Sequence, residues 1–234
     1  MCTLTFWPTT RGGILTQNRD EQSSRSSITM VRDALTYPRD AKAGGTWAVA
    51  SELGQVRCLL NGAYTKHQHL PPYKLSRGLM LLQSFEFETL HDFVQSFDFQ
   101  GVEPFTIIDF SAGKLTEFRW NGHQVDTKSL PPDKPAIWSS CTLYSTEEQQ
   151  LRAKNWQYWQ PKFDDAAIEI WQLHTIRVAD DAPLSLVRTF DVGAQTVSTI
   201  QFELTEGQTN IRYFERESGV LQRANLTSLT VNNR

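Results

Sequence analysis

Cysteine is scarce in this sequence, and its three cysteines, Cys2, Cys58 and Cys141, are widely spaced. Their number is odd and they form no CxxC pair, which argues against a disulfide framework. We therefore expect free thiols and a reducing, cytoplasmic setting.

Long apolar runs and a strong charge of either sign are also missing. No segment approaches the roughly 18–20 consecutive apolar residues that a membrane span needs, and no basic region followed by an apolar stretch begins the chain. The formal net charge is −3, so no overall basic field would hold nucleic acid or an anionic membrane. No glycine-rich loop leads into a predicted helix, as a phosphate-binding loop would. We therefore expect no nucleic-acid partner, no membrane span, and no bound cofactor or metal.

What remains is a balanced globular composition in a chain of 234 residues. Hydrophobic residues make up 39% and charged residues 21%, which is enough apolar material for a sizeable core. No linker, low-complexity tract or repeat divides the chain, so we predict a single domain over residues 1–234. The side-chain pattern predicts strands, two helices, strands, two helices and strands again, which is an α+β order. Two sheets packed on each other, each covered by a helical pair, would form four layers, αββα.

The expected strands are residues 3–7, 14–20, 45–50, 55–61, 104–110, 114–120, 136–143, 196–204 and 210–216. The expected helices are residues 75–86, 88–97 and 164–176, together with a helix that follows the S-x-x-E capping box at 145–148 and runs to about Gln160.

The first two strands form a predicted hairpin whose register depends on its turn. Cross-strand partners in a hairpin have a constant index sum. A turn centred on Thr10-Arg11 makes that sum about 21 and places Cys2 opposite Arg19. A tight turn at Gly12-Gly13 makes it about 25 and places Cys2 opposite Ser23. Either register brings the start of the chain near the charged end of the second strand, and the first brings it nearer.

That charged end is an Asn-Arg-Asp-Glu cluster at residues 18–21. Initiator methionine is usually removed before a small residue such as cysteine, which would leave Cys2 with a thiol and a free amine. An ordinary thiol, with a pKa of about 8.5, is only slightly ionised at neutral pH, whereas an N-terminal amine titrates close to neutrality and could take the thiol proton. Arg19 would favour the thiolate, Asp20 would hold the ammonium or orient the amine, and Asn18 would donate a hydrogen bond to an oxyanion.

The same residues also have a purely structural interpretation, in which Cys2 is a small strand residue and the cluster is a solvated strand end. Other candidates favour ordinary roles. His67-Gln68-His69 has a spacing that could chelate a metal, yet no Cys, Asp or Glu adjoins it, so we interpret it as an exposed loop pair. His174, within a predicted helix, is expected to be a structural histidine, and Cys58 a core residue.

Four pieces of the sequence occur in a defined order: MCT at the start, NRDE at 18–21, GGTW at 44–47 and SRG at 76–78. Together they resemble the NRDE family, also called the transport-and-Golgi-organisation-2 family, and a late VSTIQFEL strand extends the resemblance. The family looks related to N-terminal-nucleophile hydrolases of the choloylglycine hydrolase and penicillin V acylase type. The resemblance implies a four-layer αββα fold and amide hydrolysis, with Cys2 as nucleophile and Asp20 binding its α-amine.

The resemblance also assigns roles to Arg19 and Asn61. Arg19 stands for the arginine near the sulfur, although the acylases have that arginine before an asparagine, whereas here Asn18 precedes Arg19. Asn61, at the end of a predicted strand, resembles an asparagine of the oxyanion hole. The second oxyanion asparagine should fall within residues 139–142, which contain none. Losing one such donor typically costs roughly 100- to 1000-fold in turnover.

The leading hypothesis is a cytoplasmic N-terminal cysteine amidohydrolase that acts on a small non-peptide amide after removal of Met1. The residues expected to act are Cys2, Arg19, Asp20 and Asn61 as catalytic groups and Asn18 as a substrate-binding group. A rival hypothesis is a non-catalytic carrier that binds a small hydrophobic ligand, such as haem, a lipid or an acyl conjugate, in connection with trafficking. A third is a thiol-based redox or conjugation role for Cys2.

Overall fold

The computed structural model describes residues 2–22, 28–162, 165–176, 186–188 and 193–227. A six-stranded sheet has the order β10-β1-β2-β11-β12-β13 and a seven-stranded sheet runs from β3 to β9 in sequence order. The strands of the first sheet are β1 (Cys2–Thr9), β2 (Gly12–Glu21), β10 (Ala136–Ser139), β11 (Gln195–Thr205), β12 (Gln208–Glu215) and β13 (Leu221–Thr227). Those of the second are β3 (Ile28–Arg32), β4 (Leu35–Asp40), β5 (Ala48–Ser51), β6 (Val56–Asn61), β7 (Phe105–Ser111), β8 (Lys114–Trp120) and β9 (Val125–Leu130).

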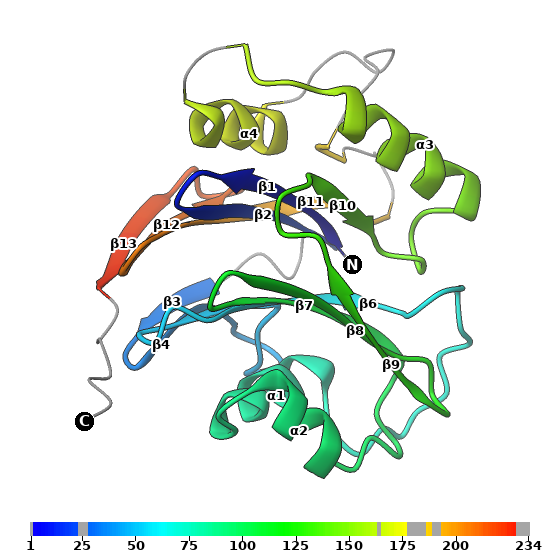
Figure 1. The fold of residues 1–234 in the computed structure, drawn as a ribbon. Coiled ribbons are helices and arrows are strands. Elements are labelled where there is room, and N and C mark those ends of the chain that lie inside the picture. Colours follow the sequence, from blue (N-terminus) through cyan, green and yellow to red (C-terminus); the bar gives the residue numbers. More distant parts are fainter. Residues whose placement is uncertain (1, 23–27, 163–164, 177–185, 189–192, 228–234) are drawn as a thin grey trace, which may run out of the picture.

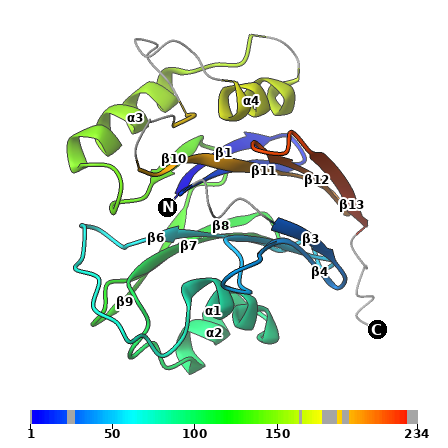
Figure 2. The ribbon, with the colours of Figure 1, turned by 180° about the vertical axis from the view of Figure 1, so that it is seen from behind.

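The two sheets stack face to face with helices on both outer faces (Figures 1 and 2). The six-stranded sheet is covered by α3 (Thr146–Tyr158) and α4 (Ala166–Thr175). The seven-stranded sheet is covered by α1 (Arg77–Gln83), the short 3₁₀ helix η2 (Ser84–Glu86) and α2 (Leu90–Ser96). The predicted α+β fold with four αββα layers is confirmed. No described helix has the length and apolar character needed to cross a membrane.

Side chains alternate along the strands, so that one face of each sheet packs in the core between the two sheets and the other face packs against the helices. In β1, Leu4 and Phe6 are fully buried in the apolar cluster that also holds Leu60 and Ile108 of the second sheet. The intervening Thr3 and Thr5 face the other way, and Thr5 bonds to a histidine of α4. Because side chains in a strand alternate between its faces, the two faces of β1 and β2 carry different chemistry.

The first hairpin has the register with Cys2 opposite Arg19 and Thr9 opposite Gly12, which is the first of the two expected alternatives, with its turn at Thr10-Arg11. Gly12 and Gly13 serve close packing. A Cβ at Gly13 would lie 2.5 Å from the Phe6 ring, and one at Gly12 would run into the carbonyl of Leu204 in β11. Side chains at these positions would push apart strands that must pair.

Most other expected elements are present. The β5–β6 hairpin, the helical pairs and the capping box of Ser145 and Glu148 at the start of α3 are confirmed. The expected strand 136–143 is shorter, because the chain turns at Ser140, whose carbonyl accepts from the N–H groups of Leu143 and Tyr144. Four strands, β3, β4, β9 and β13, were not predicted from the sequence. Three of these are edge strands. In β9 the side chains do not alternate as a half-buried strand would, and in β13 they alternate only between exposed and half-buried positions.

Two glycines bring the β4–β5 connection against the start of α1. A Cβ at Gly45 would lie 2.6 Å from the carbonyl carbon of Gly78, and a Cβ at Gly78 would lie 2.7 Å from the carbonyl oxygen of Thr46. The N–H of Thr46 donates to the Gly78 carbonyl at 3.3 Å. The GGTW and SRG pieces of the sequence therefore form one close backbone contact between a strand connection and a helix.

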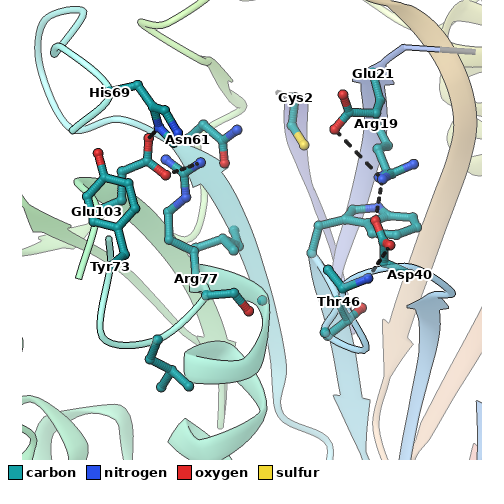
Figure 3. A pocket seen from close by; sticks show the side chains of 17 residues that line it. Cys2, Arg19, Glu21, Asp40, Thr46, Asn61, His69, Tyr73, Arg77 and Glu103 are labelled. Atoms are coloured by element: carbon teal, nitrogen blue, oxygen red, sulfur yellow. Dashed lines mark hydrogen bonds and ion pairs between the residues drawn. The ribbon is translucent and has the colours of Figure 1, made fainter. Parts of the chain in front are cut away.

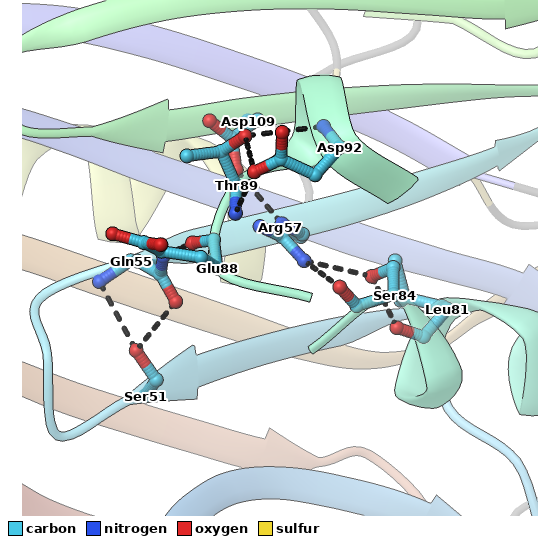
Figure 4. A network of polar contacts seen from close by, with 9 residues as sticks. All are labelled: Ser51, Gln55, Arg57, Leu81, Ser84, Glu88, Thr89, Asp92 and Asp109. Atoms are coloured by element: carbon cyan, nitrogen blue, oxygen red, sulfur yellow. Dashed lines mark hydrogen bonds and ion pairs between the residues drawn. The ribbon is translucent and has the colours of Figure 1, made fainter. Parts of the chain in front are cut away.

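The buried guanidinium of Arg57 anchors the α1–η2 segment to the second sheet (Figure 4). Arg57 is 0% exposed, and its Nε donates to Asp109 on the adjacent strand at 2.9 Å. Its Nη1 donates to the carbonyl and hydroxyl oxygens of Ser84, and its Cζ lies 4.3 Å from the centre of the Phe85 ring. Breaking such a buried pair strands an uncompensated charge, so this contact fixes the helices firmly.

His174 links α4 to the first sheet and is a structural histidine, as expected. Its Nδ1 donates to Asn18 Oδ1 at 3.0 Å, and its Nε2 accepts from Thr5 Oγ1 at 2.8 Å. The amide nitrogen of Asn18 donates to the Leu186 carbonyl, and Thr199 Oγ1 donates to Asn18 Oδ1. The ring is thus held neutral, in one tautomer, within a buried polar network.

We expect Gly78→Val to lower the free energy of unfolding by about 2–3 kcal/mol, because the added side chain must displace the backbone at Thr46. The control is Gly113→Asn, since Gly113 has φ +73° and open space around its Cβ, and asparagine tolerates this conformation. Urea denaturation measures both. A cost for Gly78→Val no larger than that of the control would contradict the close contact.

Acid should destabilise the protein through His174. Burial, together with the charge of Arg152, lowers the pKa of His174 to about 3. The unfolded chain, with an ordinary histidine pKa of about 6.5, therefore binds a proton that the folded chain does not, and stability falls as the pH drops through this window.

In His174→Gln this proton uptake is lost. The free energy of unfolding of the wild type should therefore fall relative to that of His174→Gln, by up to about 1.4 kcal/mol per pH unit, as the pH drops from about 6 to 4. Urea denaturation at several pH values measures it, with exposed His91→Gln as control. A difference that stays constant with pH would argue against this role.

Candidate functional site

A cleft of about 450 Å³ opens where the start of β1 faces the start of α1. Figure 3 shows its two walls, with Cys2, Arg19, Glu21, Asp40 and Thr46 on one side and Asn61, His69, Tyr73, Arg77 and Glu103 on the other. The backbone of Gly45 and Gly78 also lines it. The close contact of these two glycines therefore shapes the part of the cleft that their backbone lines.

Cys2 places its thiol on the wall formed by the first sheet. It is 3% exposed, lies opposite Arg19 in the hairpin, and accepts a backbone hydrogen bond from Ser140 at 3.0 Å through its carbonyl. Burial raises the pKa of the Cys2 thiol, as does the Asp20 carboxylate, while the Arg19 guanidinium lowers it. The thiol is therefore protonated at neutral pH, and its reaction as a nucleophile requires a base.

Arg19 shares the cleft face of the hairpin with Cys2, and acidic neighbours hold it in place. Its Nη2 lies 2.6 Å from Asp40 Oδ2 and 3.8 Å from Glu21 Oε2. Its guanidinium also lies 4.7 Å from the centre of the Trp47 ring. Positive charge beside Cys2 is thus fixed in position by an ion pair, an aromatic face and the hairpin itself.

Asp20 and Asn18 lie on the opposite face of β2, because neighbours in a strand alternate. Neither lines the cleft. The amide of Asn18 is occupied by His174, Thr199 and Leu186 in the network under α4. The structure therefore brings Cys2, Arg19 and Asn61 together in the cleft, and leaves both Asn18 and Asp20 outside it.

The Asp20 carboxylate is fully buried and only partly satisfied. Its Oδ1 accepts from Thr196 Oγ1 at 2.7 Å, whereas its Oδ2 has no hydrogen-bond partner among the described residues. Burial raises the pKa of Asp20 to about 6, although Thr196 and nearby arginines lower it. A buried carboxylate oxygen without a donor is costly, so this atom is suited to receive a cationic or N–H partner.

Asn61 ends β6 on the far wall, and the segment 139–142 lies next to it. Ser140 Oγ donates to the Asn61 carbonyl at 2.6 Å and also bonds to Thr142 Oγ1, while the Ser140 N–H binds Cys2. The segment that contains no asparagine thus reaches both Cys2 and Asn61. The Ser140 hydroxyl is already engaged in holding the Asn61 backbone.

A polar cluster on the far wall was not predicted. Glu103 Oε1 accepts from His67 Nε2 at 2.9 Å and from His69 Nδ1 at 3.1 Å, and Oε2 pairs with Arg77 Nη2 at 2.9 Å. The interpretation of an exposed loop pair holds for His69 but is wrong for His67, whose side chain is 17% exposed. Glu103 is distant in sequence, so no local motif pointed to it.

The arrangement offers a buried thiol, a fixed guanidinium, an amide side chain and a carboxylate–histidine group around one small cavity. These are the groups needed for attack on a carbonyl, for stabilising its oxyanion and for moving protons. In the part of the chain that the structure describes, no cluster of three or more His, Cys, Asp or Glu side chains has the geometry to hold a metal ion.

Two solved structures show the same fold at low sequence identity. One is a C2A mutant of conjugated bile acid hydrolase from Clostridium perfringens, with a TM-score of 0.56, 10% identity, and coverage of 97% of this chain and 92% of that chain. The other is the Caenorhabditis elegans ortholog of N-acylethanolamine-hydrolyzing acid amidase, with a TM-score of 0.57, 12% identity, and coverage of 86% and 92%. These likenesses show the fold of the N-terminal-nucleophile hydrolases that the resemblance implied.

No curated protein matches the sequence. The profile of the family described as Transport and Golgi organisation 2 matches residues 1–160, which is more than half of the chain and includes β1, β2 and the whole seven-stranded sheet. The chain therefore belongs to the Transport and Golgi organisation 2 family.

Proposed function

We propose that the protein is an N-terminal cysteine amidohydrolase that cleaves a small non-peptide amide after Met1 is removed. The observation that carries this proposal is the position of Cys2, whose thiol lines a cleft and which pairs with Arg19, the residue of β2 that directly precedes the incompletely satisfied Asp20. The hydrolase fold supports the same conclusion.

Removal of Met1 would supply the base that the buried thiol needs. The new α-amine would stand at the end of β1, between the Cys2 thiol on one face and Asp20 on the other. Asp20 Oδ2 lacks a partner among the described residues and would accept a hydrogen bond from the ammonium. The amine would take the thiol proton as the sulfur attacks, as N-terminal threonine nucleophiles use their own amine.

The reaction then proceeds in two stages. The Cys2 sulfur forms a bond to the amide carbonyl carbon, and the carbonyl oxygen becomes an oxyanion that Asn61 and nearby backbone N–H groups stabilise. The C–N bond breaks, the amine leaves with a proton, and a thioester remains. Water attacks the thioester, the C–S bond breaks, and a carboxylic acid and the free thiol are released.

Two features of the surroundings of Cys2, the fixed charge of Arg19 and the size of the cleft, support this reaction. Arg19 is held by Asp40 and Glu21, so its charge offsets the thiolate without moving toward the substrate. The cleft of about 450 Å³ has the size of a small-molecule site, which favours a small amide over a folded protein substrate.

Trapping an acyl-enzyme tests the nucleophile and separates a hydrolase from a carrier. We expect the wild-type protein, with an intact mass lacking Met1, to gain one acyl group on Cys2 from a 4-nitrophenyl ester and to release nitrophenol in a burst. Cys2→Ala should lose both signals, while Cys141→Ala, which removes a thiol that does not line the cleft, should keep them. Reversible binding without an adduct would instead support the carrier, and oxidation without acylation a redox role.

Replacing Asp20 tests the source of the base. Asp20→Asn keeps an acceptor for Thr196 but removes the charge that holds the ammonium, so ester turnover should fall by about 100-fold or more while the fold remains. Exposed Asp33→Asn is the matched control. A second variant with Lys inserted between Met1 and Cys2 retains methionine and should be equally impaired. Full activity in either test variant would exclude the α-amine as base.

A further inference from the structure

The far wall of the cleft carries a group that the proposed chemistry has not yet used. Glu103 is hydrogen bonded to His67, His69 and Arg77, and its side chain is only 13% exposed. Burial raises the pKa of Glu103, but Arg77 and the two histidines together lower that pKa by more, so that it lies below the ordinary value for glutamate. Glu103 is therefore an ionised carboxylate that both imidazole rings share.

The carboxylate fixes which nitrogen of each ring bears hydrogen. A carboxylate oxygen only accepts hydrogen bonds, so His69 must carry a proton on Nδ1. Its Nε2 is then the atom that exchanges a proton. His67 is held the same way through Nε2 but does not line the cleft.

His69 is the member of the cluster that faces the reaction space. Its side chain is 68% exposed, lines the cleft, and lies beside the Tyr73 ring at a centroid distance of 5.3 Å. Figure 3 shows it with Asn61 and Glu103 on the wall across from Cys2. A substrate attacked by Cys2 therefore has its far side toward His69.

Amide cleavage needs a proton at that far side. An alkylamine or aniline leaves only after its nitrogen is protonated, whereas nitrophenolate leaves as a stable anion. The α-amine would stand at the end of β1, next to the sulfur and across the cleft from His69, so a second proton carrier on the far wall would divide the two transfers between two groups.

We propose that His69 is a catalytic residue that gives the leaving amine its proton and that Glu103 is the positioning residue that holds its ring. This inference rests on the proposed hydrolase function. The Nε2 proton passes to the substrate nitrogen as the C–N bond breaks, which leaves neutral His69 beside the thioester. The water that attacks next gives one proton to Nε2 as the C–S bond breaks, the α-ammonium returns its proton to the released Cys2 sulfur, and the original state returns.

Two chromogenic substrates with the same acyl group isolate this role: 4-nitrophenyl hexanoate, whose leaving group needs no proton, and hexanoyl 4-nitroanilide, whose leaving group does. We expect His69→Gln to slow acylation by the anilide, followed as single-turnover release of nitroaniline, by about 100-fold and to change the rate of the nitrophenol burst from the ester less than threefold, because only the anilide leaving group needs a proton. Glu103→Gln should produce a smaller loss with the same selectivity. His123→Gln, at an exposed turn, is the matched control.

Chemical rescue separates a proton carrier from a structural residue. Added imidazole should restore anilide turnover to His69→Ala and leave Cys2→Ala inactive. The role of His69 would be overturned if His69→Gln slowed both substrates equally or left the anilide rate unchanged. It would also be overturned if the wild-type protein turned over only the ester. Absence of any Cys2-dependent ester turnover in the wild-type protein would instead refute the hydrolase function, and this inference with it.

Discussion

The antiparallel register of β1 and β2 is the constraint on which the site depends. With Cys2 paired to Arg19, strand alternation sends these two side chains toward the second sheet and sends Asn18 and Asp20 toward the helices. Four consecutive residues thus supply two different environments. One face offers a fixed positive charge beside a thiol, and the other offers a buried acceptor near the chain start and an amide that holds α4 through His174. A shift of one residue would exchange the two sets.

The register alone would leave Cys2 at an open strand end, and the second sheet turns this end into a cleft. The contact between Gly45 and Gly78 lets the β4–β5 connection and α1 approach closely, while Arg57 fixes the segment after α1 to β6 and β7. Asn61 then reaches the cleft from the end of β6. The far wall is therefore held by backbone packing and a buried ion pair, both of which keep its polar groups in place without help from a ligand.

Local patterns were enough to predict the first hairpin with two alternative registers, the helical pairs and the capping box, because each depends on neighbours in sequence. The four layers were compatible with the order of elements and were implied by the family resemblance. Edge strands such as β9 and β13 were missed because solvent, rather than a core, sets their composition. In the site, the meeting of Cys2 with Arg19 followed from the hairpin. The pairing of Glu103 with His69, and the occupation of Asn18 by His174, arise from tertiary contacts between distant segments. No spacing in the sequence encodes those contacts.

In the proposed reaction, the lack of an asparagine in segment 139–142 would make the oxyanion harder to stabilise. Ser140 cannot take its place as an oxyanion donor, since its hydroxyl is bonded to the Asn61 carbonyl and its N–H to Cys2. With fewer donors, the tetrahedral oxyanion is less stabilised and collapses quickly, either back to substrate or forward to thioester. The direction of collapse depends on whether the amine nitrogen is protonated in time. An acid held on the far wall would favour the forward step, so a weak oxyanion site gives leaving-group protonation a larger share of the rate.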